Sequence, residues 1–287
     1  MEAGKISDLP RRFLISVIVI LCAGLLIAFS PHFWVSVVVL LFIAALAAVG
    51  VWEYVQLAQA KDLHPSSHLM IIVSIIEVFA FFLARQFPQL SQLPLIVLFV
   101  GVIAFFLAHF KHAYKALAQV AIELFGVCYV ALPLCFMLGI LYPVAKDAAP
   151  QDGRWWLMYL IAVTKITDIG AYFVGKLWGK HKLAPFLSPK KTMEGAAAGF
   201  CCAVAASVAM YWAGKKWLVG SFSLTFPEAL WMGMVIGLLA QIGDLAESLL
   251  KRDAFVKDSN RLPGLGGVLD MLDSLLLTAP VVYFFLS

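Results

Sequence analysis

The chain has little charge for its length. Of its 287 residues, 13% are Asp, Glu, Lys or Arg, whereas 63% are hydrophobic. A soluble domain of this size needs a much more polar surface, so this composition excludes an ordinary soluble globular protein. It indicates a polytopic integral membrane protein instead.

Several common motifs and patterns are also missing. The sequence has no GxxxxGK[ST] phosphate loop, no kinase motif set and no HExxH zinc motif, which argues against those enzyme classes. It shows no repeat of 20 to 50 residues and no inverted pair of broken helices of the kind that transporters carry. The five cysteines all lie in apolar runs without metal-type spacing, so we expect no disulfide bonds.

Long hydrophobic runs are abundant. A helix that crosses the ~30 Å hydrocarbon core needs roughly 20 apolar residues. The runs predict an all-α fold of about nine transmembrane helices, and the fifth and sixth of these could be broken. The expected helices are 13–30, 33–52, 68–84, 93–110, 117–144, 155–177, 193–213, 227–250 and 267–286. A signal peptide is the alternative for the first run, but the run has no convincing cleavage site and is followed at once by another spanning stretch, so we expect a retained hairpin.

The two halves of the chain differ in polar content. Residues 1–150 carry mostly plain hydrophobic helices, with Glu53, Glu77 and Glu123 as their few polar candidates. Residues 151–287 hold nearly all the dense polar motifs. We therefore expect one integral membrane domain, with a scaffold and lipid-access region in 1–150 and a catalytic region in 151–287.

The basic residues are distributed unevenly between alternate loops. If the N-terminus is cytoplasmic, fifteen Lys and Arg lie on the cytoplasmic side and five on the other. This is a positive-inside bias, and it places the basic loops 176–191 and 251–261 in the same compartment. The net charge of +4 thus reflects topology, and nucleic acid is not an expected partner.

Four polar clusters interrupt the apolar runs of the C-terminal half, where each ionisable group costs at least ~2.5 kcal/mol on insertion scales. In the first, Lys165, Asp168 and Tyr172 recur on one helical face. This spacing predicts a carboxylate aimed at a polar cavity, with Lys165 orienting it. The alternative is a local Lys165–Asp168 pair that neutralises itself.

The second cluster is SPKKTMEG, residues 188–195, directly before an apolar run. Ser188 followed by Pro189 predicts an N-cap and first helical position. Lys190 and Lys191 would then lie in the first turn, where the helix dipole disfavours cations unless an anion binds there. We therefore expect phosphate binding at this helix start, and the alternative is a basic loop that only sets topology.

The third cluster is a polar stripe on the run at 227–250. Asp244, Glu247, Ser248 and Lys251 follow one another at helical spacing. Asp244 lies more than a turn inside the exit at Lys251, which simple solvation does not explain. For Glu247 and Lys251 an ion pair at the membrane interface is an equal alternative.

The fourth cluster combines a glycine-rich loop with two aspartates. Gly264, Gly266 and Gly267 let the backbone approach a ligand and offer amides. Asp270 and Asp273 lie one turn apart, and two carboxylates in a low-dielectric site favour a shared cation. Oxygen ligands together with phosphates suit Mg²⁺. The clusters together predict an enzyme that transfers a phosphoryl or nucleotidyl group to a lipid.

With these residues in view, the chain closely resembles the bacterial phosphatidate cytidylyltransferase (CDP-diacylglycerol synthase) family. The family pattern S-x-x-K-R-x4-K-D…P-G-H-G-G-x-x-D-R-x-D is matched by Ser248, Lys251, Arg252, Lys257, Asp258, Pro263, Gly264, Gly266, Gly267, Asp270 and Asp273. The upstream pattern D-x-G-A-Y…GKHKLAP…SP-x-K-T-x-x-G is matched from Asp168 through Gly195. Leu265 and Met271 replace a family histidine and arginine, and Arg261 is a candidate to supply the missing cation.

The resemblance implies the reaction of CTP with phosphatidate to give CDP-diacylglycerol and pyrophosphate. It implies Mg²⁺, with or without a second cation, held by Asp244, Asp270 and Asp273, with Asp168 and Lys251 also catalytic. Substrate binding would involve Ser188, Lys190, Lys191, Thr192, Ser248, Arg252, Lys257, Asp258, Arg261, Gly264, Gly266 and Gly267. The expected location is the plasma (inner) membrane, with the active site facing the cytoplasm, and a homodimer is left open. The alternatives are a CTP-dependent polyprenol or diacylglycerol kinase and, from another class, a transporter.

Overall fold

The computed structural model describes residues 21–111, 114–143, 151–217, 222–256 and 267–287. Within them, eight helical spans are long and apolar enough to cross a membrane, which confirms an all-α polytopic membrane fold. The helices are α2 (Phe33–Gln59), α3 (Ser67–Gln86), α4 (Leu93–His109), α5 (Ala116–Gly126), α6 (Leu132–Leu141), α7 (Gly153–Trp178), α8 (Met193–Trp217), α9 (Phe226–Asp253) and α10 (Val268–Leu286), with a short 3₁₀ turn η1 (Pro88–Leu90). The first predicted run, 13–30, lies partly outside the described residues, and its residues 21–28 are helical.

The sequence left open whether the fifth and sixth predicted spans are broken; the fifth is one helical span, Ala116–Leu141, with a π-helical segment inside it, and the sixth is also continuous. A π-helical segment, η2 (Val127–Ala131), joins α5 to α6. Pro133 follows at the start of α6. Because proline cannot donate the usual i to i−4 hydrogen bond, the widened turn just before it is a common local solution. In contrast, α7 runs without a break from residue 153 to 178.

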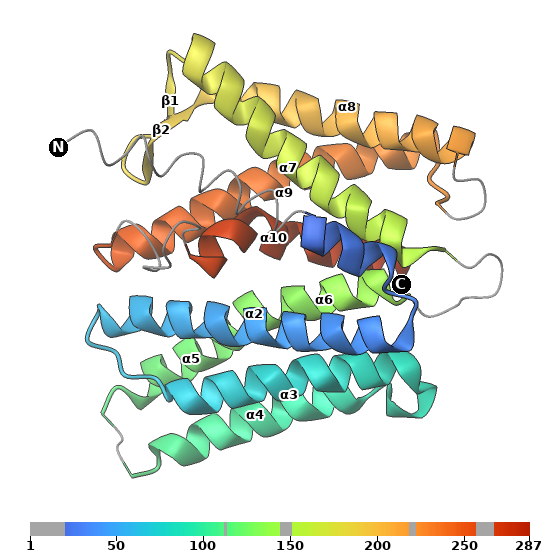
Figure 1. Ribbon diagram of the computed structural model, residues 1–287. Coiled ribbons are helices and arrows are strands. Elements are labelled where there is room, and N and C mark those ends of the chain that lie inside the picture. The colour runs from blue at the N-terminus through green and yellow to red at the C-terminus, as the bar shows by residue number, and fades with distance from the viewer. Residues whose placement is uncertain (1–20, 112–113, 144–150, 218–221, 257–266) are drawn as a thin grey trace, which may run out of the picture.

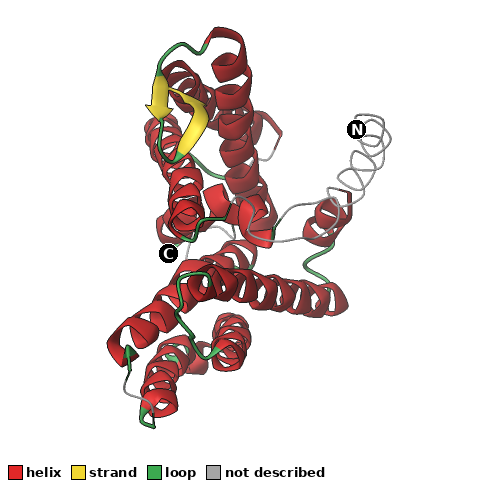
Figure 2. Cartoon of the chain, turned by 90° about the vertical axis from the view of Figure 1, so that its left-hand side faces the viewer, coloured by secondary structure: helices red, strands yellow, loops and turns green. Residues whose placement is uncertain are grey.

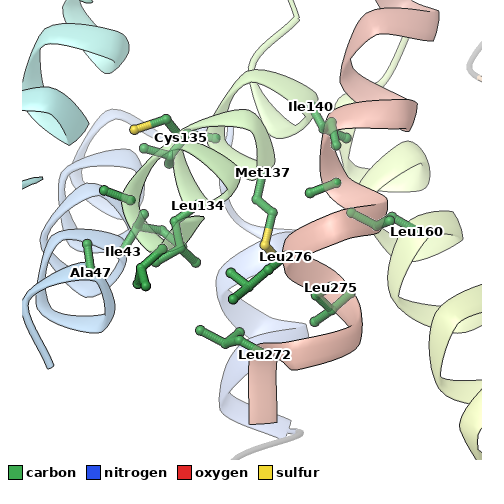
Figure 3. Packing of buried hydrophobic residues seen from close by; sticks show 14 of the residues in the cluster. Ile43, Ala47, Leu134, Cys135, Met137, Ile140, Leu160, Leu272, Leu275 and Leu276 are labelled. Atoms are coloured by element: carbon green, nitrogen blue, oxygen red, sulfur yellow. The ribbon is translucent and has the colours of Figure 1, made fainter. Parts of the chain in front are cut away.

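The helices form two groups with α10 between them (Figure 1). The α2–α6 segment makes one group and α7–α9 the other, and α10 packs on α9, α6, α7 and α2. Figure 3 shows Leu275 and Leu276 of α10 among side chains of α6 and α7. Lipid tails are as apolar as leucine, so close packing and hydrogen bonds hold such helices together more than hydrophobic burial does.

Small residues allow the helices of the C-terminal group to approach closely. A Cβ added to Gly199 of α8 would lie 2.8 Å from the carbonyl oxygen of Thr167 in α7. A Cβ on Gly243 of α9 would lie 2.4 Å from the carbonyl oxygen of Asp273 in α10. Glycine at these crossings brings the backbones that carry the polar clusters into contact.

Contacts between distant segments define the two ends of the bundle. At one end, Lys61 pairs with Asp253 at 3.1 Å, and Arg252 Nε donates to the Leu187 carbonyl at 3.0 Å. These contacts place the α2–α3 loop, the α7–α8 connection and the end of α9 together, as Figure 1 also shows.

At the other end, Arg154 donates to the Ala28 carbonyl at 2.9 Å. Burial by itself raises the pKa of the Asp152 carboxyl, but hydrogen bonds from Arg154 outweigh it and lower that pKa. The Asp152 carboxylate also accepts the Arg154 backbone N–H at 3.0 Å, so it caps the start of α7.

The predicted helix start at Ser188 is wrong. Residues Ser188–Thr192 form strand β2, which pairs antiparallel with β1 (Lys182–Ala184) in a hairpin outside the helices (Figure 2). The helix starts at Met193, where the Thr192 hydroxyl accepts the Gly195 N–H at 3.2 Å. This start puts Glu194 in the first turn, where the helix dipole favours an acid, and keeps Lys190 and Lys191 out of it. Because the helix begins after these lysines, they do not meet the unfavourable end of its dipole, and no bound anion is needed to explain their position.

All five cysteines are free, as expected.

Candidate active site

A cavity of about 510 Å³ lies among α7, α8, α9 and the hairpin. Its lining includes charged side chains of both signs, namely four lysines and two aspartates. The lining residues are Asp168, Ala171, Tyr172, Gly175, Lys176, Lys182, Leu183, Lys190, Lys191, Thr192, Gly195, Ala196, Gln241 and Asp244. Three of the four predicted clusters therefore contribute to one concave site.

Glycines let α7 and the start of α8 pack closely at one wall of this cavity. A Cβ on Gly195 would lie 2.6 Å from the Ala171 carbonyl oxygen and 3.0 Å from the Cα of Gly175. A Cβ on Gly175 would lie 2.9 Å from the Thr192 hydroxyl. Because no side chain fits there, the α8 start and its cap are held directly against α7.

The first cluster joins α7 to α10. Lys165 pairs with Asp168 at 3.3 Å, and both side chains contact the Ser274 hydroxyl at 3.1 Å. Lys165 also donates to the Met271 carbonyl at 3.4 Å. The local pair of the alternative interpretation is thus present, yet Asp168 also lines the cavity, so the pair holds a carboxylate in position at its wall.

The second and third clusters meet in an ion pair. Lys191 Nζ of β2 lies 2.6 Å from Asp244 Oδ2 of α9. Asp273 of α10 is within electrostatic reach of Asp244 and Asp168, and its carboxylate accepts the Ser274 N–H at 2.5 Å. Three aspartates from three helices therefore share one region of negative potential next to the lysines.

Asp270 has different neighbours from Asp273. Its carboxylate pairs with Lys251, which also pairs with Glu247 at 2.6 Å. Glu247 is buried, and the Lys251 side chain is only 12% exposed. The Glu247–Lys251 pair of the alternative interpretation exists, and together with Asp270 it forms a largely buried three-residue group that links α9 to the start of α10.

The oxygen donors suit a hard divalent cation, and their arrangement limits how one would be held. Among the described residues, no group of three or more His, Cys, Asp or Glu side chains is arranged to hold a metal ion. Asp244 and Asp270 each have a lysine partner instead. Mg²⁺ commonly takes one or two protein carboxylates and completes its shell with substrate phosphates and water. The residues fit a cation of that kind, which does not need a three-carboxylate cage.

The remaining predicted site residues are spread around this region. Ser188 lies in β2, Ser248 is half-buried in α9, Arg252 contacts Leu187, and the Gly267 N–H donates to Asp270 Oδ2 at 3.2 Å. Lys257, Asp258, Arg261, Gly264 and Gly266 lie outside the described residues.

The sequence analysis assigned no site role to several polar residues that lie in or near this region. Lys176 lies one turn beyond Tyr172 and Gln241 one turn before Asp244, so helical spacing had the information to find both. Glu194 accepts the backbone N–H groups of Lys180 and His181, which closes the hairpin onto α8. Glu53 accepts two N–H groups of α10, and no local pattern could have shown a partner more than 200 residues away.

Known proteins resemble the chain over nearly its whole length. A phosphatidate cytidylyltransferase of Chlamydia pneumoniae is 35% identical over 294 residues, covering 99% of this chain and 94% of the relative. One of Chlamydia muridarum is 30% identical over 282 residues, covering 96% and 92%. One of Bacillus subtilis is 42% identical over 138 residues, covering 48% and 49%. The model of the cytidylyltransferase family matches residues 10–287, and the chain belongs to that family.

Proposed function

We propose that the chain transfers the cytidylyl group of CTP to phosphatidate, giving CDP-diacylglycerol and pyrophosphate. Family membership over residues 10–287 and relatives named for this reaction support the assignment. The observation that carries it structurally is the cavity in which Lys176, Lys182, Lys190 and Lys191 face Asp168 and Asp244. The triphosphate of CTP needs a cluster of cations of this kind. A bundle of membrane helices gives a lipid substrate direct access to the site.

In this reaction the phosphate of phosphatidate attacks the α-phosphorus of CTP, and the bond to the β,γ-diphosphate breaks. The nucleophile is already an anion, so no separate general base is needed. The four lysines would neutralise the triphosphate, reduce repulsion of the incoming phosphate and stabilise the leaving pyrophosphate. The chain's contribution is positioning and charge, with Asp168 fixed by Lys165 and Ser274.

We propose Mg²⁺ as the cofactor, bound together with the phosphates of CTP. Its protein ligands would be one or two carboxylates from among Asp244, Asp270 and Asp273, and Asp168 lies within electrostatic reach of Asp244. When bound, the ion would offset the charge of the transferring phosphoryl group. Because Asp244 and Asp270 are paired with Lys191 and Lys251, these lysines would have to share or release their partners when the ion binds.

The chain is a multi-pass membrane protein, and we propose that it lies in the plasma membrane with the cavity facing the cytoplasm. The basic hairpin and the basic end of α9 lie at the cavity end, and positive charge favours the cytoplasmic side.

Isotope placement tests the reaction directly. Purified protein with phosphatidate and Mg²⁺ should move the α-phosphorus label of CTP into the lipid and the γ-phosphorus label into pyrophosphate. The competing lipid kinase would place the γ label in the lipid and leave the α label in CDP, which would overturn the proposal.

A further inference from the structure

The N-terminal half holds the start of α10 through one buried carboxylate. Glu53 of α2 is fully buried. Its Oε1 accepts the Val268 N–H at 2.9 Å and its Oε2 accepts the Leu269 N–H at 2.9 Å. Both bonds join residues more than 200 positions apart in the sequence. The two amides belong to α10, the helix that carries Asp270 and Asp273.

These bonds replace the cap that the sequence does not provide. The N-cap residue of α10 is Gly267, which has no side chain to accept a first-turn N–H. Asp270 accepts the Gly267 N–H, and Glu53 accepts the next two. A carboxylate at this point is also favoured by the helix dipole.

At this contact α2 packs closely on its neighbours. A Cβ on Gly50, one turn before Glu53, would lie 2.8 Å from Val130 in the π-helical segment and 3.7 Å from Leu269. The backbone of α2 therefore lies directly against η2 and the first turn of α10. Any shift of α2 would be transmitted to the turn that presents Asp270.

We infer that Glu53 is a positioning residue, which sets the register of the α10 start and thereby the placement of Asp270 and Asp273. This inference rests on the proposed function, since those aspartates matter only for the transfer reaction. It assigns the N-terminal half a part in catalysis beyond scaffolding and lipid access.

Glu123 offers a matched control. It is also fully buried, and its Oε1 accepts the Ser66 N–H at the start of α3 at 2.6 Å, as well as contacting His109 Nε2 at 2.9 Å. It is therefore a second buried glutamate at a helix start, but α3 carries none of the proposed site residues. A purely structural role predicts that Glu53→Gln and Glu123→Gln have similar effects.

Steady-state kinetics of the full-length protein in detergent with phosphatidate should distinguish a positioning role of Glu53 from a purely structural one. Since misplacement of reacting groups by about 1 Å can cost ~100-fold, we expect Glu53→Gln to lower kcat at least ~10-fold with the KM for phosphatidate within about twofold. Glu123→Gln should keep kcat within about twofold, whatever its melting temperature. Hydrogen exchange at the Val268 and Leu269 amides should accelerate in Glu53→Gln only.

Glu53→Asp serves where the glutamine variant does not fold. It keeps the charge but is one methylene shorter, so it cannot reach both amides, and its kcat should fall as well. The inference is overturned if folded Glu53 variants keep the wild-type kcat, or if Glu123→Gln loses as much. An inactive wild-type protein would instead overturn the proposed function.

Discussion

At the residue scale, the charged groups of the cavity act in pairs. Lys191 with Asp244, and Lys165 with Asp168, each bring a basic and an acidic side chain to the same wall. These side chains are partly exposed, so each pair orients its members at the cavity wall more than it stabilises the fold. A triphosphate can replace the aspartates as the partner of the lysines, and a cation can replace the lysines as the partner of the aspartates. The arrangement therefore suits a site in which substrate and metal exchange places with these ion pairs.

Removing the Asp244 carboxylate tests the acidic side of the cavity. Asp244→Asn keeps the size but removes the charge that we propose binds Mg²⁺, and kcat should fall at least ~100-fold. Asp253→Asn is the control, because Asp253 is an exposed aspartate on the same helix that pairs only with Lys61 among the described contacts. Steady-state CTP turnover of correctly inserted protein measures both. Near-normal turnover of Asp244→Asn would remove it from the metal site.

Lys191 tests the basic side. Lys191→Ala removes a charge-assisted contact to phosphate, whose usual contribution of ~1.5–3 kcal/mol corresponds to about a 10- to 100-fold rise in the KM for CTP. Lys115→Ala is the control, since Lys115 is an exposed lysine that contacts the Asp62 carbonyl outside the cavity. Equal KM values for the two variants would show that positive charge in general, and not this position, matters.

At the element scale, the sequence predicted the extent of the membrane-spanning helices better than it predicted the start of the helix that follows the hairpin. A helix in lipid must satisfy its own backbone hydrogen bonds, so a long apolar run allows few alternatives, and α3, α7 and α9 lie within a few residues of expectation. The Ser188–Pro189 signal was overridden by pairing of β2 with β1 and by the Thr192 cap. Asp168, Lys191 and Asp244 were found from spacing on single helices or loops. Glu53 was noted only as a polar residue in an apolar run, because its acceptor role depends on tertiary contact alone.

The α7–α8 crossing gives a test of packing at this scale. Gly195→Ala would place a methyl group 2.6 Å from the Ala171 carbonyl, which is backbone and cannot rotate away. Overpacking of this kind costs ~1–3 kcal/mol and should separate α8 from α7 at the cavity wall, lowering both melting temperature and affinity for CTP. Gly24→Ala is the control, because nothing lies within 4 Å of its added Cβ. Thermal unfolding with and without CTP measures both effects, and an unchanged Gly195→Ala protein would contradict the close approach.

At the scale of the whole molecule, α10 unites the two helix groups. It contacts α9 and α7 on one side and α6 and α2 on the other. Its first-turn amides bond to Glu53 of α2, its Ser274 donates to Asp168 of α7, and its Asp270 pairs with Lys251 of α9. The predicted division into a scaffold half and a catalytic half describes where the motifs lie in the sequence, and Glu53 of the first half bonds to the start of α10 across that division.

The orientation of the bundle follows from the same contacts and gives the last prediction. The α2–α3 loop and the hairpin lie at the cavity end, so Asp62→Cys and Phe186→Cys should both react with a membrane-impermeant thiol reagent from the cytoplasmic side. Gln89→Cys, in η1 at the opposite end, should react only from the other side.

The five native cysteines must first be replaced, since Cys22 and Cys201 are exposed on the protein surface. Labelling of all three positions in intact and in permeabilised cells measures the orientation. If Asp62→Cys and Phe186→Cys were labelled from opposite sides, the lysines of the hairpin could not share a compartment with the start of α3, and the single cytoplasmic site would be wrong.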